Sequence, residues 1–171
     1  MSTATLDVRD YPAVEDALKR TRDQFGEIDV LVAGAAGNFP APVLGMSAKA
    51  FKAVVDIDLL GTFNTFRASY QYLRKPGASI IAISANHATM PIAWQAHVCA
   101  AKAGVDLLTR TLAIEWGPDG VRANCITPGP TDDTEGVRRL APTPESRCKF
   151  EENVPLSAPK TNSRISPVSV L

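Results

Sequence analysis

The sequence lacks an excess of charge of either sign. Its 171 residues contain 18 Lys and Arg and 18 Asp and Glu, so the formal net charge is +0. A protein that binds nucleic acid or an anionic membrane surface usually carries an excess of basic residues. The composition favours neither partner, and we expect no nucleic acid and no membrane.

Cysteine is also scarce, and no segment is apolar enough to cross a bilayer. Cys99, Cys125 and Cys148 show no metal-ligand spacing, so we expect free thiols in a reducing compartment and no metal site. The segment Met1 to Leu6 contains no basic patch followed by an apolar run. The terminal Ser169-Val170-Leu171 lacks the basic middle residue of the usual peroxisomal signal. The expected location is therefore cytoplasmic.

Strand-like and helix-like segments alternate along the chain with short connections. Apolar runs predict the strands, and helical periodicity with capping residues predicts the helices between them. The predicted strands are Ala4–Val8, Ile28–Ala33, Ser79–Ser84 and the apolar segment that ends in Pro128-Gly129-Pro130. The predicted helices begin at Asp10, at Ser47 and near Trp94. This alternation is typical of an α/β fold with a parallel sheet.

The length of the chain is sufficient for one domain with a substantial core. We expect residues 1–150 to form that domain. From Ala141 onward prolines interrupt the chain, and its last stretch is polar. The tail 151–171 is therefore expected to be irregular or disordered.

Three features carry candidate chemistry. Lys102 lies among small residues on a largely apolar helix, where a ligand or another backbone can approach; the alternative is a solvated lysine. Asp58 has apolar neighbours, and a buried carboxylate needs a partner or a role; the alternative is a bond to a nearby backbone group. The small residues of Gly34–Phe39 follow a strand, where parallel sheets place ligands, unless they form an ordinary tight turn.

Six motifs together resemble those of the short-chain dehydrogenase/reductase family. In chain order they are Asp7-Val8, Gly34–Phe39, Asp56-Ile57-Asp58, Ala101–Asp106, Leu112–Gly117 and Pro128-Gly129-Pro130. The match covers roughly Thr5 to Ala141, in the right order and spacing. Within the family, Ala36–Phe39 and Thr134–Leu140 are most similar to the peroxisomal-type 2,4-dienoyl-CoA reductases and their bacterial relatives.

Two active-site positions depart from the usual family pattern. Classical members carry a tyrosine four residues before the active-site lysine and a serine thirteen residues before that tyrosine; here these positions are Val98 and Ala85. Dienoyl-CoA reductases lack the same pair, and they resemble this chain in the acidic residue at Asp58. Without a phenol to act as the acid, the usual interconversion of alcohol and ketone is not expected.

The resemblance also implies a Rossmann-like, doubly wound parallel sheet, of which this chain would hold only a part. The sequence contains no Gly-rich pyrophosphate turn, and the match begins at what would be the third strand. The family's first two strands and its last strand are therefore expected to be absent. The two missing strands would lie between Ala4–Val8 and Ile28–Ala33.

For the cofactor, which the resemblance implies to be NADPH, several residues are expected to make contacts. They are Asp7, Val8, Ala35, Ala36, Gly37, Lys102, Pro128 and Gly129. The first two would flank the adenine ring, and the next three would pass the cofactor with their backbone. The last two would frame the nicotinamide, while Lys102 would bond to its ribose and place positive charge near the reacting centre.

For the substrate, the resemblance implies an acyl-CoA. Phe39 and the segment from Thr134 to Leu140 would border its pocket, with Arg138 and Arg139 available for the CoA phosphates. Hydride transfer from NADPH to the δ-carbon of a 2,4-dienoyl thioester would give a dienolate that must then be protonated.

The catalytic residues implied are Lys102 and Asp58, which with a water would stabilise the dienolate and deliver the proton. His87 is a secondary candidate for the donor, and a surface loop histidine is the alternative.

Three functions remain open from the sequence. The first is reduction of 2,4-dienoyl-CoA thioesters in unsaturated fatty-acid β-oxidation, which would be peroxisomal in a full-length eukaryotic relative. The second is another oxidoreductase reaction of the same superfamily. The third is a truncated, non-catalytic fragment that acts only by subunit association. The helices expected at 47–74 and 94–116 have apolar faces suited to a homo-oligomer interface, as in family tetramers.

Overall fold

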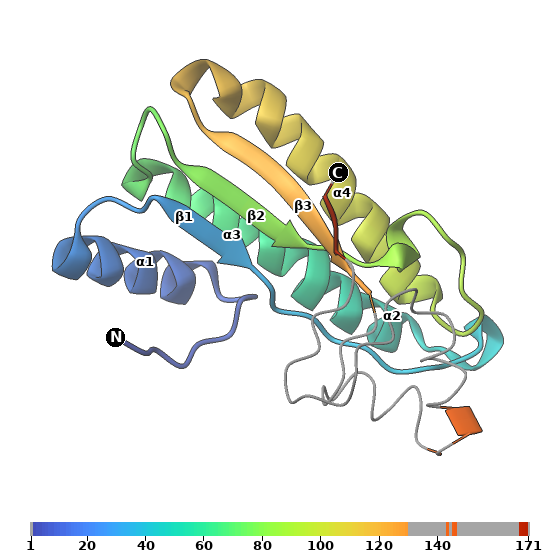
Figure 1. Cartoon of the computed structure of the whole chain (residues 1–171). Helices are drawn as coiled ribbons and strands as arrows, with labels where there is room; N and C mark the ends of the chain where they lie inside the picture. Colours follow the sequence, from blue (N-terminus) through green and yellow to red (C-terminus); the bar gives the residue numbers. More distant parts are fainter. Residues whose placement is uncertain (1, 130–142, 144, 147–167, 171) are drawn as a thin grey trace.

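The computed structural model describes residues 2–129, 143, 145–146 and 168–170. These residues include one four-stranded sheet with helices packed against it (Figure 1). The strands are β1 (Val30–Ala33), β2 (Ser79–Ile83), β3 (Arg122–Pro128) and β4 (Val168–Val170), in that spatial order. The first three strands run parallel to one another, and β4 runs antiparallel to β3. The predicted α/β fold with a parallel sheet is therefore confirmed, with one antiparallel strand added.

Helix α1 (Tyr11–Phe25) begins and ends where the local sequence predicts. The Asp10 carboxylate accepts a hydrogen bond from the backbone N–H of Ala13 at 3.2 Å, which caps the helix. Pro12 lies in the first turn, where no intrahelical N–H is needed. Gly26 ends the helix with a φ of 88°, a backbone conformation that residues other than glycine rarely adopt.

The helical segment between β1 and β2 carries Asp58. Ser47 caps it, because its side chain accepts a hydrogen bond from the N–H of Ala50 at 3.1 Å. The segment continues as α2 (Ala48–Val55), the π-helical turn η2 (Asp56–Leu60), α3 (Gly61–Ser69) and the 3₁₀ turn η3 (Tyr70–Tyr72). The predicted long helix is confirmed, but its central residues, Asp56–Leu60, form a π-helical turn in place of α-helix. Such π turns are frequent at functional sites, and here the turn contains Asp58.

Helix α4 (Ala96–Trp116) carries Lys102 and connects β2 to β3. It lies with α3 on one face of the sheet, and α1 packs against α3 (Figure 1). Fully buried Phe66 from α3, Ile80 from β2 and Val105 from α4 meet in the core between these helices and the sheet. The remaining described helical turns are η1 (Val43–Gly45), η4 (Asn86–Ala88) and η5 (Gly117–Asp119).

Strand β1 is buried on one face only. Side chains alternate along a strand, so Leu31 and Ala33 face the core. Val30 and Val32 are 58% and 55% exposed on the opposite face. The continuous apolar run is typical of a parallel strand covered on both faces, but among the described residues the helices cover one.

The predicted strand at Ala4–Val8 is wrong, because this segment has no strand beside it in the described structure. A strand is stable only when a neighbour pairs with its backbone groups. Here the Val8 carbonyl instead accepts a hydrogen bond from the Asn64 side chain at 2.9 Å. The next strand also begins later than predicted, at Val30, while Ile28 forms an isolated bridge with Leu73.

The predicted tail, residues 151–171, lies outside the described residues except at Val168–Val170, which form β4. The division of the chain into 1–150 and 151–171 therefore stays a prediction. Within the part of the chain that the structure describes, no helix is both long and apolar enough to cross a membrane.

Candidate active site

Lys102 and Asp58 form a buried ion pair. Helix α4 positions Lys102, the π turn η2 positions Asp58, and Lys102 Nζ lies 3.5 Å from Asp58 Oδ2. Their side chains are 8% and 1% exposed. The ammonium also donates a hydrogen bond to the carbonyl of Ile83 at 2.9 Å, at the end of β2. A solvated lysine is thereby excluded, and the pair lies at the carboxyl end of that strand.

The two oxygens of Asp58 have different surroundings. Oδ1 accepts a hydrogen bond from the backbone N–H of Gly37 at 2.7 Å. Oδ2 has no hydrogen-bond partner among the described residues. Burial raises the pKa of Asp58 above its usual value, while the Lys102 charge and the Gly37 N–H oppose that rise. The backbone-bond alternative is thus correct for one oxygen, and the other can accept from a water or a ligand.

A glycine on α4 allows the two charged residues to meet. A Cβ atom on Gly104 would lie 2.9 Å from Leu59 Cδ2, a distance that side-chain carbons essentially never show. The small residues around Lys102 were expected to admit a ligand or another backbone. The structure places the η2 turn there, and the close approach brings Asp58 to Lys102.

The predicted cofactor residues at the ends of the strands share one edge of the sheet. Ala35 and Ala36 follow β1 and are exposed, so their backbone groups are accessible. Pro128 and Gly129 lie at the end of β3 and are half-buried. Because β2 lies between β1 and β3, these two segments flank the strand end that Lys102 contacts.

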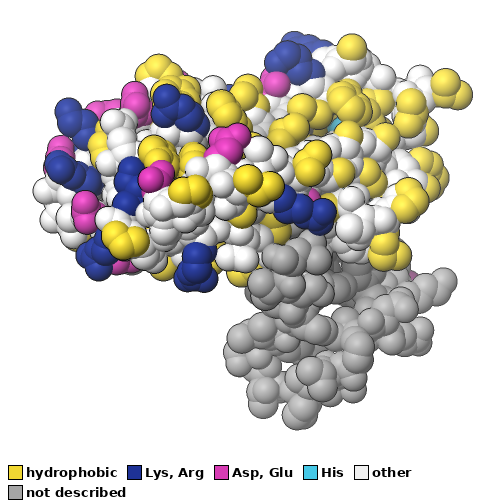
Figure 2. Space-filling view, turned by 90° about the horizontal axis from the view of Figure 1, so that it is seen from above, with side chains coloured by type: hydrophobic (Ala, Val, Ile, Leu, Met, Phe, Trp, Pro, Cys, Tyr) yellow, Lys and Arg dark blue, Asp and Glu magenta, His cyan; other side chains and the backbone are white. Residues whose placement is uncertain are grey.

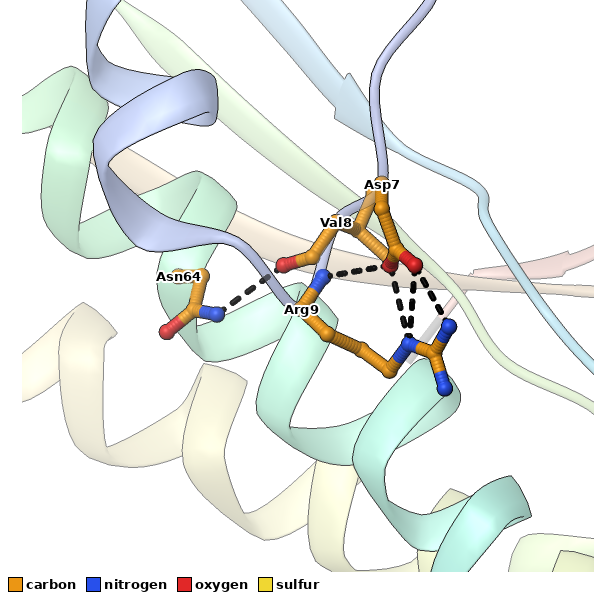
Figure 3. Close-up of polar contacts among 4 residues, drawn as sticks. All are labelled: Asp7, Val8, Arg9 and Asn64. Atoms are coloured by element: carbon orange, nitrogen blue, oxygen red, sulfur yellow. Dashed lines mark hydrogen bonds and ion pairs between the residues drawn. The ribbon is translucent and has the colours of Figure 1, made fainter.

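Asp7 and Val8 are held by contacts that Figure 3 shows. The Arg9 side chain donates to the Asp7 carboxylate, with Nε 2.9 Å from Oδ1, and lowers the pKa of Asp7 to about 2. Asn64 donates to the Val8 carbonyl, and a Cβ atom on Gly61 would lie 2.6 Å from Val8 Cγ2. Sequence reasoning missed Asn64 and Gly61, although a glycine inside a helix indicates close packing.

Of the predicted substrate residues, the structure describes only Phe39. It is half-buried, and its ring lies 4.4 Å from that of His97, centroid to centroid. Thr134, Arg138 and Arg139 lie outside the described residues, and their roles stay predictions.

The two positions that depart from the family pattern offer no acid near Lys102. Val98 is buried one turn before Lys102 on α4, and Ala85 follows β2. His87 lies in η4 and is half-buried, with Nδ1 shielded from solvent. Burial and the charge of Lys102 lower the pKa of His87, which favours its neutral form.

The fold and the site together define a Rossmann-like α/β protein with its polar site at the carboxyl edge of a parallel sheet. A family model described as Enoyl-(Acyl carrier protein) reductase matches residues 2–170. The chain therefore belongs to the short-chain dehydrogenase/reductase family.

Individual relatives agree with this assignment. The chain is 50% identical over 141 residues to a peroxisomal 2,4-dienoyl-CoA reductase of Saccharomyces cerevisiae, covering 82% of this chain and 48% of the relative. It is 46% identical over 148 residues to the peroxisomal 2,4-dienoyl-CoA reductase of Rattus norvegicus, covering 86% and 50%. The chain spans about half the length of these curated relatives.

A solved structure shows the same fold. Carveol dehydrogenase from Mycobacterium avium, solved in complex with NAD, superposes with a TM-score of 0.79 at 27% identity. The match covers 88% of this chain and 59% of that one.

Proposed function

We propose that the chain acts as an NADPH-dependent reductase of 2,4-dienoyl-CoA thioesters in unsaturated fatty-acid β-oxidation. The observation that carries the proposal is the buried Lys102–Asp58 pair with an apolar Val98 where the usual acid would stand. The names of the two relatives support the same substrate class. Their peroxisomal location makes the peroxisome the proposed compartment for a protein of this kind.

The residues at the carboxyl edge of the sheet fit a nicotinamide cofactor. Ala35 and Ala36 are exposed beside that edge and carry only a methyl side chain, so a ligand can approach their backbone closely. Pro128, Gly129 and Lys102 would hold the nicotinamide end, and Asp7 and Val8 the adenine end. When bound, the cofactor supplies the hydride.

The chain's own residues would handle charge and protons. Lys102 places a positive charge in a site shielded from water, where it stabilises negative charge that develops on the thioester oxygen. Asp58, whose pKa is raised by burial, can hold a proton and pass it on through a water. Val98 offers no proton, which disfavours reduction of a ketone.

The experiment is a binding titration of the purified chain with NADPH and with NADH, followed by NADPH consumption on addition of 2,4-hexadienoyl-CoA. We expect NADPH to bind and to raise the melting temperature. Asp58→Asn should lower turnover by about 10²–10⁴-fold, the usual range for a lost acid, with NADPH affinity little changed. Lys52→Met, which alters an exposed lysine, is the control.

Two results would redirect the proposal. Reduction of a ketone at a rate similar to that of the dienoyl thioester would favour another oxidoreductase of the superfamily. Absence of NADPH and NADH binding by a chain that melts cooperatively would favour the third function, association without catalysis.

The associating function is favoured by one observation on the helices. Leu107 and Ile114 on α4 are 65% and 79% exposed, and Phe63 on α3 is 43% exposed. Phe63, Arg67 and Glu115 line a pocket between these two helices. Figure 2 views the molecule from above Figure 1 and shows apolar side chains exposed among charged ones; they gather most at the right-hand end, where Figure 1 draws the start of α4 and the loops beside it. We propose that α3 and α4 pair with a second copy of the chain.

Ile114→Glu should shift the chain from dimer or higher oligomer to monomer, because a carboxylate would be buried in the helix interface. Size-exclusion chromatography with light scattering measures the mass. Val43→Glu, at a similarly exposed apolar residue on η1, is the matched control and should leave the oligomer intact. A monomeric parent chain, or an oligomer unaffected by Ile114→Glu, would contradict this interface.

A further inference from the structure

His97 is a fully buried histidine whose imidazole has no hydrogen bond. It lies in the first turn of α4, is 0% exposed, and packs against the Phe39 ring at an interplanar angle of 63°. Neither Nδ1 nor Nε2 has a partner among the described residues. Burying a polar group without a hydrogen bond costs about 1–3 kcal/mol, so an unpaired imidazole here needs an explanation.

A short loop contacts both the imidazole of His97 and the carboxyl of Asp58, whose Oδ2 is ion-paired with Lys102 but makes no hydrogen bond among the described residues. The two side chains contact opposite ends of the segment Gly37–Phe39: the N–H of its first residue donates to Asp58 Oδ1, and the ring of its last contacts the His97 ring. His97 is near enough to Asp58 that a positive charge on the imidazole would lower the pKa of that carboxyl. Both groups are nearly inaccessible to solvent.

Two residues adjacent in sequence to His97 and Phe39 carry further buried acceptors without hydrogen bonds. Gln95 Oε1, from the residue before α4, and Asn38 Oδ1, from the loop beside Phe39, are also buried without hydrogen-bond partners among the described residues. A buried water typically makes about three hydrogen bonds to otherwise unpaired polar groups. Because a water donates two hydrogen bonds, a water that accepts from the imidazole could donate to Asp58 Oδ2 and to one further acceptor.

We propose that His97 is a positioning residue for Asp58: an imidazole N–H donates to a bound water, and that water donates to Asp58 Oδ2. The bridge gives the carboxylate a second donor opposite the Gly37 N–H and fixes its orientation toward Lys102. The titratable groups of this site are Asp58 on η2, which interacts electrostatically with His97, and Lys102 on α4, which acts on both Asp58 and His87. The bridge requires neither a nucleotide nor a substrate.

The test is the pKa of Asp58, measured from its side-chain carbonyl ¹³C chemical shift in the full chain. His97→Leu removes the donor and should raise the proton affinity of Asp58 about tenfold, which is a pKa shift of about one unit. His97→Gln and His97→Asn place an amide N–H near the positions of Nε2 and Nδ1, and at least one of them should restore the parent value. A role in packing alone predicts no such rescue.

A second measurement decides the question if the leucine variant fails to fold. The ¹⁵N shifts of the imidazole in the parent chain should show one tautomer with a fixed protonated nitrogen. Asp58→Asn removes the carboxylate and should leave both tautomers populated. An unchanged imidazole spectrum in Asp58→Asn would overturn the proposal, as would an unchanged Asp58 pKa in a folded His97→Leu chain.

Discussion

Lys102→Met is expected to lower the free energy of unfolding by about 3–5 kcal/mol at pH 7, the usual cost of removing one partner from a buried ion pair. The substitution keeps most of the side-chain volume but leaves the Asp58 carboxylate, 1% exposed, without its counter-charge. It also removes the hydrogen bond to the Ile83 carbonyl. Urea unfolding followed by circular dichroism measures the change.

The effect of this substitution should depend on pH in a defined direction. The pKa of Asp58 is raised in the folded chain above its ordinary 3.8, so the native state binds a proton more readily than the unfolded state. The resulting stability is fully present below pH 3.8 and is lost as pH rises through the folded pKa. Lys102→Met removes a charge that lowers the pKa of Asp58, so this pKa should be higher in the variant than in the parent chain. The pH range over which stability is lost should then extend closer to neutral pH, and the variant should become more stable as the pH is lowered and Asp58 is protonated.

Two further variants isolate the charge. Lys52→Met removes one partner of the exposed Lys52–Asp56 pair and should cost about 0–1 kcal/mol. Lys102→Met combined with Asp58→Asn should recover part of the lost stability, because no unpaired charge then remains buried. Equal costs for the two lysine substitutions, or a loss independent of pH, would contradict a role for the buried pair.

The pair itself could be predicted from the sequence, because its residue types are unusual in their surroundings. An aspartate and a lysine on otherwise apolar helices are rare unless they are paired, and the helix cap at Ser47 identified the helical segment that carries Asp58. The distance between Lys102 and Asp58 could not be predicted from either helix alone. It depends on the packing of Gly104 against Leu59, which joins two helical segments.

Other features depend on contacts that a linear pattern does not contain. His97 and Gln95 are polar residues of types that are often exposed, but both are buried, and His97 packs against the ring of Phe39 from a distant loop. The segment Ala4–Val8 has a strand-like pattern, but a strand needs a neighbour, and here the Asn64 side chain takes the Val8 carbonyl instead.

Phe66→Ala is expected to lower the free energy of unfolding by about 3–5 kcal/mol, the usual cost of truncating a buried phenylalanine. Phe66 is 0% exposed and belongs to the core in which α3 and α4 pack on the sheet. Removal of its ring forfeits burial of apolar surface and leaves a cavity that the surrounding helices can only partly fill. Domains of this kind are typically stable by about 5–15 kcal/mol, so the loss is a large share of the total.

Phe25→Ala is the matched control for this truncation. The helical pattern predicts Phe25 on the same face of α1 as Val14, but Val14 is 4% exposed and Phe25 is 59% exposed. Because the Phe25 ring stays largely in water, its truncation should change the free energy of unfolding by about 0.5 kcal/mol or less. Both variants are measured by urea unfolding with the parent chain. A small loss in Phe66→Ala would contradict a packed core beneath the sheet, whereas a large loss in Phe25→Ala would show that something covers the end of α1.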